Sequence, residues 1–280
     1  FNRNLAKECD CMKKKFFVVI AIIVVLVIMA IFAPIFATFD PNTTDLLNIR
    51  TSPNKVHILG TDDLGRDIFS RLLYGGRVSI AVGVASMMLQ ILIGVTIGVI
   101  AGYFGGLIDK IIMRIVDIIM CFPFFVIAIA LAAVIGGSIT NLVLIIGMLM
   151  WPVITRIVRG EVLVTKQNEY ILAAKALGFN TFEIIIHHII PNIISAILVS
   201  STLCIAQGIL MEATLSFLGL GVNPPTPSWG NMLVAAQNMS VLSHKWWMWI
   251  PAGMSVVLIV LSVNFVGDGL RDALDVEKSV

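Results

Sequence analysis

Few ionisable side chains in this sequence lie within its apolar segments, where a charge would have a structural or ligand-binding role. Glu212 is the clearest example. It lies within a long apolar segment, residues 193–220. An ionised group at the middle of a bilayer costs about 2.5 to 3.5 kcal/mol on insertion scales, so it faces a helix bundle or a wet cavity. Glu212 is therefore expected either to line the path of a transported solute or to hydrogen-bond a neighbouring helix and fix its packing.

The histidines and the short motifs argue against catalysis. His187 and His188 are adjacent, and adjacent residues of a helix point about 100° apart, so we do not expect them to chelate one metal ion. The sequence contains no GxxxxGK[ST] phosphate loop, no HExxH pattern and no GxSxG nucleophile elbow. We expect no metal site and no enzymatic activity, and the chain by itself lacks the loop that would cradle ATP.

Two further patterns are typical of contacts between helices. Asp117 follows Arg114 by three residues, so the two side chains share one helix face and can pair. This pair is expected to anchor its helix rather than to touch a solute. Gly94, Gly98 and Gly102 recur every four residues and leave a flat strip for close packing, either within the bundle or against another subunit.

The elements that must position these residues are membrane helices. Of the 280 residues, 58% are hydrophobic and only 13% are charged, whereas soluble domains average about 25% charged residues. The net charge of +2 and the lack of a clustered basic face give no reason to expect nucleic-acid binding. Crossing a bilayer core about 30 Å thick takes roughly 20 apolar residues. Six stretches qualify, at residues 16–37, 78–102, 111–135, 142–158, 193–220 and 246–266.

Charge at the ends of these stretches predicts the topology. Lys13, Lys14 and Lys15 directly precede the first stretch, and cytoplasmic flanks of spans carry the excess of lysine and arginine. The first stretch is too long for a signal peptide, and the fourth is short and interrupted by Pro152. The sequence therefore predicts an all-α membrane protein with a cytoplasmic tail at 1–15, an extracytoplasmic loop at 38–77, a five-helix core at 78–266 and a second cytoplasmic tail at 267–280.

An amphipathic segment is expected in the extracytoplasmic loop. Asp62 and Asp63 can cap a short helix with Arg66 and Arg71 on one side and apolar residues (Ile68, Phe69, Leu72, Leu73) on the other. Such a helix is expected to lie along the membrane surface. Either it contacts a substrate-delivering protein through Asp62, Asp63 and Arg66, or it is a passive interfacial helix.

A helix-stop-helix element interrupts the apolar pattern on the predicted cytoplasmic side, within residues 160–191. Gly178 is expected to end a first helix, because glycine readily takes the left-handed conformation at a helix stop. Asn180 followed by Glu183 is typical of a capping box that starts a second helix. That second helix is expected to end at Pro191, where the next span begins.

One face of this element carries almost no side chain. Ala173, Ala174 and Gly178 lie on it, so the backbone of another protein could approach closely there. The alternative is an amphipathic interfacial loop without a partner.

The order Ala173-Ala174, Gly178, His188 and Pro191 resembles the cytoplasmic EAA signature of permease subunits of bacterial ATP-binding-cassette importers. In that family the loop docks into a groove of the ATPase, so the resemblance implies a coupling role for these five residues. Leu172 stands where the namesake glutamate is common. This departure removes one possible polar contact to the ATPase.

Three other stretches resemble the C-type subunits of the dipeptide, oligopeptide and nickel group, at residues 58–83 (ILGTDDLGRDIFSRLLYGGRVSIAVG), 212–233 (EATLSFLGLGVNPPTPSWGNML) and 267–275 (GDGLRDALD). The resemblance implies a type I importer permease fold in a bacterial inner membrane, with no cofactor in this chain. It also implies a homologous B-type permease, two ATPase subunits that bind ATP and Mg²⁺, and an extracytoplasmic substrate-binding protein.

Two alternatives remain open at the level of sequence. The group resemblance favours di- and oligopeptides as substrates, but nickel or a metal chelate fits the same signatures. An ion-coupled secondary transporter would usually show paired inverted repeats, and we find no convincing internal duplication in the sequence.

Overall fold

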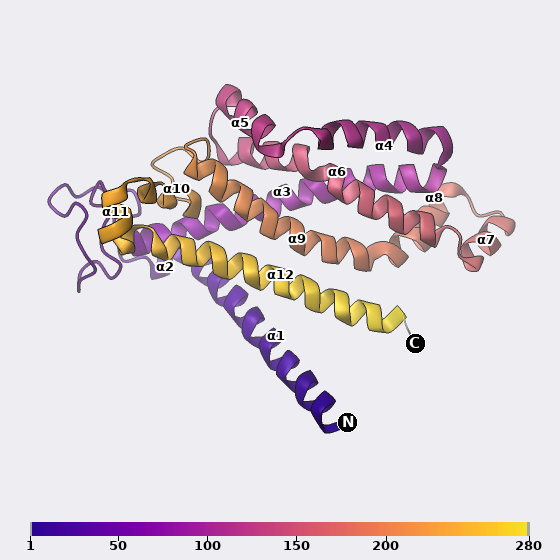
Figure 1. Cartoon of the computed structure of the whole chain (residues 1–280), viewed down its shortest axis with the longest axis horizontal. Coiled ribbons are helices and arrows are strands. Elements are labelled where there is room, and N and C mark those ends of the chain that lie inside the picture. The colour runs from indigo at the N-terminus through magenta and orange to yellow at the C-terminus, as the bar shows by residue number, and fades with distance from the viewer. Residues whose placement is uncertain (1, 279–280) are drawn as a thin grey trace.

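Four long apolar helices form the body of the chain in the computed structural model (Figure 1). They are α3 (Ile68–Phe104), α6 (Ile139–Thr165), α9 (Ile190–Phe217) and α12 (Ile250–Lys278). The structure describes residues 2–278, and for residues 2–15 and 274–278 it describes the helical backbone only. No β-strand occurs within this described part, which confirms the all-α class.

Shorter elements gather at the two ends of this body, which we name the α7 end and the α10 end (Figure 1). The α7 end carries α7 (Glu169–Ala176), α8 (Thr181–Ile184) and a π-helical turn (Ile185–Ile189). The α10 end carries α2 (Ala33–Phe36), the loop that follows it, α10 (Trp229–Leu233), a 3-10 turn (Val234–Gln237), α11 (Met239–His244) and a second 3-10 turn (Trp246–Met248). The remaining helices are α1 (Asn2–Ile31), α4 (Gly106–Cys121) and α5 (Phe124–Ile135).

Each predicted span overlaps a helix or a helix pair of the described chain, but not every one of these is long enough to count as a span. Four continuous helices of the described chain are long and apolar enough to cross a membrane, with mean hydropathies of 1.9 to 2.2. A fifth span results if α4 and α5 count as one. The apolar part of α1, Phe16–Ile31, is shorter than these. The described helices are thus compatible with six spans.

The third predicted span is interrupted at a proline, whereas the fourth is not interrupted at Pro152 as expected. The third is not one straight helix, because it breaks before Pro123 and its halves α4 and α5 are bent by 79°. Phe122 has the extended backbone (ψ 135°) that proline favours in the residue before it. Pro152, by contrast, stays inside a continuous α6. It is buried within the bundle, whereas Phe122 and Pro123 are exposed, and neighbouring helices allow such a proline to persist.

The terminal helices extend beyond the predicted spans. Because α1 already begins at Asn2 and α12 continues to Lys278, the described residues of the predicted tails at 1–15 and 267–280 are helical, and the cytoplasmic location of these tails remains a prediction. Residues 68–73 are the first turns of α3 and not a separate interfacial helix. The helix α3 continues without interruption through Gly75 and Gly76. The absence of side chains at these two glycines leaves room for the backbone of Ser228 and the ring of Trp229.

The glycine strip of α3 packs against α6 within the bundle. A Cβ atom on Gly94 would lie 2.7 Å from Ile154 Cβ, and one on Gly98 would lie 2.9 Å from both the Thr155 carbonyl oxygen and Val158 Cβ. Farther along, Gly102 faces Val162. The two helices therefore approach closely over about two turns, as the glycine spacing predicts.

We predict that Gly98→Ala lowers the free energy of unfolding by about 1 to 3 kcal/mol, because the added methyl group overpacks the contact with α6. Gly160→Ala is the matched control, since Gly160 lies within α6 with nothing within 4 Å of its added Cβ. Thermal unfolding of both purified variants in detergent measures the difference. Equal stability of the two variants would contradict this account of the glycine strip.

Candidate functional site

The stop at Gly178 is a complete C-terminal cap of α7. Gly178 has φ +86°, a left-handed conformation that glycine adopts without strain. Its N–H donates to the Lys175 carbonyl (3.1 Å), and the N–H of Phe179 donates to the Ala174 carbonyl (3.2 Å). These two bonds make a Schellman motif. The predicted helix stop at Gly178 is thereby confirmed.

The second helix begins as predicted but does not end at Pro191. The Asn180 side chain accepts the N–H of Glu183 (2.9 Å), and the Glu183 carboxylate accepts the N–H of Asn180 (3.0 Å). The helix then passes through Pro191 into α9 without a break. A π-helical turn precedes the proline, with the Ile190 N–H bonded to the Ile185 carbonyl. Such a wider turn lets a helix accommodate a proline that cannot donate a hydrogen bond.

The expected small-residue face is only partly exposed. Ala174 is buried, with 5% of its surface exposed, and it packs with Ile171, Ile184 and Ile189. Ala173 and Gly178 remain exposed. The prediction that Ala174 lies on the exposed small-residue face is therefore wrong. Spacing of three residues places Ala174 on the same side of α7 as Ile171, and that side faces the core.

Large apolar side chains cover the tip of the α7 end. Leu177 is 78% exposed and Phe182 is 72% exposed. Other exposed residues of this group are Tyr170, Leu172 and Phe179. We call these five residues the apolar tip. An exposed apolar cluster of this kind is typical of a contact surface for another protein or for a membrane.

Polar contacts hold the apolar tip to the body of the chain. The ammonium group of Lys175 lies 5.1 Å from the centre of the Tyr103 ring at the end of α3. Lys166, directly after α6, donates a hydrogen bond to the Gly102 carbonyl oxygen (2.7 Å). The ring of His188 packs edge-on against Phe179 with ring centres 5.8 Å apart. α7 therefore contacts the end of α3 directly, and Lys166 joins the end of α6 to the same helix.

Glu212 is fully buried in a hydrogen-bond network that joins three helices. Its Oε2 accepts from the Ser79 hydroxyl of α3 (2.7 Å), and its Oε1 accepts from the Ser216 hydroxyl of α9 (2.7 Å). The Trp229 N–H, at the start of α10, donates to Ser79 Oγ (3.1 Å). Sequence reasoning missed Ser79 and Trp229, because no local spacing relates them to Glu212.

The predicted pairing of Asp117 with Arg114 is wrong. Asp117 of α4 instead pairs with Arg156 of α6, while Arg114 is exposed. A second pair joins Asp109 to Arg159 on the same two helices (Arg159 Nε to Oδ1 3.0 Å). Because α4 packs along α6, the acidic side chains of α4 lie close to arginines of α6 and pair with them instead of with Arg114 on their own helix. The pair anchors α4, as expected, but to a different partner.

Asp67, and not Asp62 or Asp63, caps the helix at the α10 end. Its Oδ2 accepts the Ser70 N–H (2.8 Å), and its Oδ1 lies 2.9 Å from His57 Nδ1. Asp63 is half-exposed and pairs with Arg50 in the preceding loop. The role of Asp67 was hidden in the sequence, because three aspartates within six residues are all possible caps.

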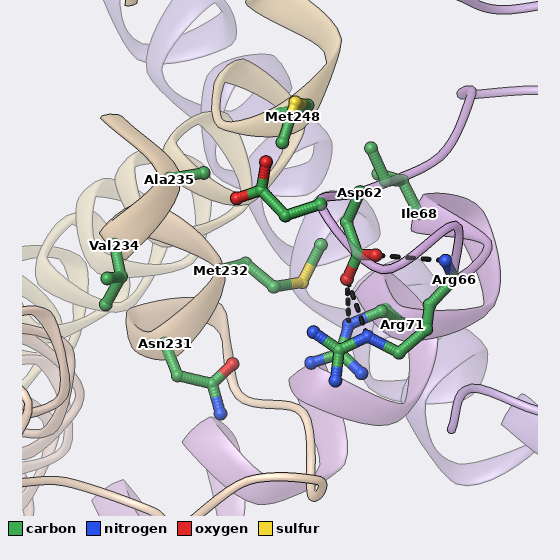
Figure 2. A pocket seen from close by; sticks show the side chains of 10 residues that line it. Asp62, Arg66, Ile68, Arg71, Asn231, Met232, Val234, Ala235 and Met248 are labelled. Atoms are coloured by element: carbon green, nitrogen blue, oxygen red, sulfur yellow. Dashed lines mark hydrogen bonds and ion pairs between the residues drawn. The ribbon is translucent and has the colours of Figure 1, made fainter. Parts of the chain in front are cut away.

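Asp62 and Arg66 belong to a mostly buried cluster with Arg71, shown in Figure 2. Arg66 Nε donates to Asp62 Oδ2 (2.7 Å), and Arg71 Nε lies 3.6 Å from the same oxygen. Side-chain exposure is 15% for Arg66 and 16% for Asp62. These side chains therefore face a cavity more than the outer surface, and their contact with a delivering protein remains a prediction.

Comparison with known proteins identifies the type of membrane protein. Residues 94–278 match the family described as binding-protein-dependent transport system inner membrane component. Residues 12–53 match the N-terminal TM domain of oligopeptide transport permease C. The first match alone spans more than half of the chain.

Similar proteins carry related names. The chain is 44% identical to the oligopeptide transport system permease protein OppC of Bacillus subtilis over 255 residues, covering 91% of this chain and 83% of that protein. It is 41% identical to the dipeptide transport system permease protein DppC of Alkalihalophilus pseudofirmus, with coverage of 91% and 83%. It is 42% identical to the glutathione transport system permease protein GsiD of Shigella flexneri, with coverage of 98% and 89%. Because the family match, the relatives and the apolar helices agree, the chain belongs to the family of inner membrane components of binding-protein-dependent transport systems.

Proposed function

We propose that this chain is the C-type permease subunit of an ATP-driven importer of di- and oligopeptides. The observation that carries the proposal is the apolar tip, because this chain has no phosphate loop and must receive the energy for transport from another protein. The relatives named for oligopeptide, dipeptide and glutathione transport support peptides as the substrate class. The partners would be a B-type permease, two ATPase subunits that bind ATP and Mg²⁺, and an extracytoplasmic binding protein.

In this proposal the chain spans a bacterial inner membrane with both termini and the α7 end in the cytoplasm. Both termini lie toward the α7 end of the molecule (Figure 1), and Lys13, Lys14 and Lys15 precede the first apolar stretch. The apolar tip would then meet the ATPases, and the α10 end would meet the binding protein. Residues 160–191 act as the coupling segment.

The coupling step follows from how the tip is held. Leu177 and Phe182 would enter a groove of the ATPase, while Ile171 and Ala174 bind the same helices to the core of the permease. ATP-driven closure of the two ATPases would pull on α7 and α8. Since α8 continues through the π-helical turn into α9, the pull reaches the middle of the membrane as a movement of one helix.

The bent pair α4–α5 would form this chain's half of the translocation path. An open cavity of about 310 Å³ lies at the bend, lined by apolar side chains that include Met120, Phe122, Phe124 and Met150. Helix breaks of this kind are tolerated in a membrane where the backbone lines a cavity or is covered by protein. Peptide would pass between this surface and the B-type permease without chemical change.

The proposal is tested by ATP hydrolysis of the reconstituted complex with its binding protein. Binding protein loaded with short peptides is expected to stimulate hydrolysis, whereas Ni²⁺ is not. Stimulation by Ni²⁺ or a chelate alone would overturn the peptide assignment and leave the importer assignment intact. Purification of the complex without any ATPase would overturn the importer assignment.

Leu177→Asp is predicted to weaken ATPase binding about 30-fold, because it places a charge in the apolar contact without touching the core. Co-purification of the ATPase with the tagged permease measures this loss. Leu47→Asp is the matched control at the α10 end, where Leu47 is 95% exposed, and it should leave co-purification unchanged. Retention of the ATPase by both variants would rule out the apolar tip as the docking surface.

For Glu212 we propose a structural role within the pathway subunit, because Glu212 is enclosed by Ser79, Ser216 and α10. Glu212→Gln retains a hydrogen-bond acceptor and should leave uptake and selectivity unchanged. Glu212→Leu removes the acceptor for two buried hydroxyl groups and should lower stability by about 1 to 3 kcal/mol. Thermal unfolding and peptide uptake are the two readouts. A change in substrate selectivity with Glu212→Gln would instead place Glu212 in contact with the solute.

A further inference from the structure

We propose that Arg66 and Arg71 form a carboxylate-binding site at the α10 end, and that this site receives the C-terminal carboxylate of a transported peptide. The inference rests on the proposed function for the identity of the ligand. The site itself rests on two adjoining cavities, an excess of positive charge and free hydrogen-bond donors.

The two cavities share the arginine pair. One, of about 170 Å³, is lined by Asp62, Asp63, Arg66 and Arg71 together with apolar residues of the α10 region (Figure 2). The other, of about 250 Å³, is lined by Arg66, Arg71, Ser216, Asn223 and Asn231 and by the backbone between them. Among the described residues, no acidic side chain lines the second cavity, so the charged part of its lining consists of the two arginines.

Asp62 is the carboxylate that pairs with both arginines, and it does not balance them, since Asp63 pairs with Arg50. Asp62 Oδ2 already faces Arg66 Nε (2.7 Å) and Arg71 Nε (3.6 Å). Its Oδ1 accepts the backbone N–H groups of Leu64 and Arg66 (2.9 Å each). Among the described residues, neither arginine has another acidic partner. Two guanidinium groups and one carboxylate leave one positive charge in a mostly buried place, where an anion would offset the cost of its burial.

The two arginines would contribute to binding in different ways. Arg71 is held in place, since its Nη1 donates to the carbonyl oxygens of Pro41 (2.9 Å) and Pro225 (3.4 Å) and only 5% of the residue is exposed. Arg66 uses only Nε on Asp62, and its two terminal amino groups donate to no group of the described chain. Arg71 therefore supplies a fixed charge, and Arg66 supplies donors that can turn to a ligand.

Chemistry and size favour a peptide end over the other candidate solutes. The planar guanidinium group matches the two oxygens of a carboxylate. A metal cation would be repelled by the same two groups. Ligand pockets for whole small molecules have volumes of roughly 300 to 1,000 Å³, so a cavity of about 250 Å³ suits one terminal residue of a peptide. The rest of the peptide would extend toward the membrane interior.

The experiment measures binding of trialanine and of trialanine amide to the purified permease complex in nanodiscs without binding protein. The free acid should bind about 10- to 100-fold more tightly than the amide, the usual value of hydrogen bonds to a charged group. Arg66→Gln should abolish this preference, and Arg66→Lys should retain part of it. Arg50→Gln is the matched control, because Arg50 pairs with Asp63 in the exposed loop and lines neither cavity.

Three outcomes would overturn the site: equal binding of acid and amide to the wild type, an unchanged preference in Arg66→Gln, or an equal loss in Arg50→Gln. If Arg66→Gln weakens only the docking of the binding protein, the carboxylate belongs to that protein and the proposal fails. Thermal unfolding of each variant separates misfolding from lost recognition. An acid preference that persists in a complex whose ATPase ignores peptide-loaded binding protein would support the site while the proposed function fails.

Discussion

The close approach of α3 and α6 is the contact on which the rest of the structure depends. Gly94, Gly98 and Gly102 bring the two backbones together, and the valine and isoleucine side chains that face them form one core cluster with residues of α7, α8 and the π-helical turn. In lipid, apolar burial contributes little to helix association, so packing at small residues must supply the stability. The helices that carry the apolar tip are therefore joined to the membrane bundle through this shared cluster, as the proposed coupling role requires.

The two ends of the bundle use charge in different ways. At the α7 end, lysines bind the carbonyl oxygen and the ring at the end of α3, and the exposed surface is left apolar for a partner. At the α10 end, arginines are gathered around one carboxylate beside open cavities. Between the ends, the carboxyl group of Glu212 accepts hydrogen bonds from two serine hydroxyl groups of the chain itself. In the proposed function, this arrangement separates energy input, helix packing and solute recognition along the length of the molecule.

Local patterns predicted much of the coupling segment and of the helix content. The stop at Gly178, the capping box of Asn180 and Glu183, and the glycine strip all depend on residues within one or two turns of each other, so the sequence contains the whole cause. The prolines show the limit of such reasoning. Pro123 and Pro152 have the same intrinsic preference, yet the helix breaks at Pro123 and continues through Pro152, which is buried among neighbouring helices. The exposed Pro191 also lies within a continuous helix, after a π-helical turn.

Sequence by itself determined that the chain is an all-α membrane protein, where its apolar helices lie, that Gly178 ends α7 and that Asn180 caps the next helix, since length, hydropathy and capping are local properties. Only the tertiary structure decided that Ala174 faces the core, that Asp117 pairs with Arg156, and that Glu212 meets a serine 133 residues away. It alone placed Arg66 and Arg71 beside the loop after α9. These contacts depend on which faces of the helices pack together. The periodicity of a single helix does not determine which of its faces packs against which neighbour, so only the packed structure decides this.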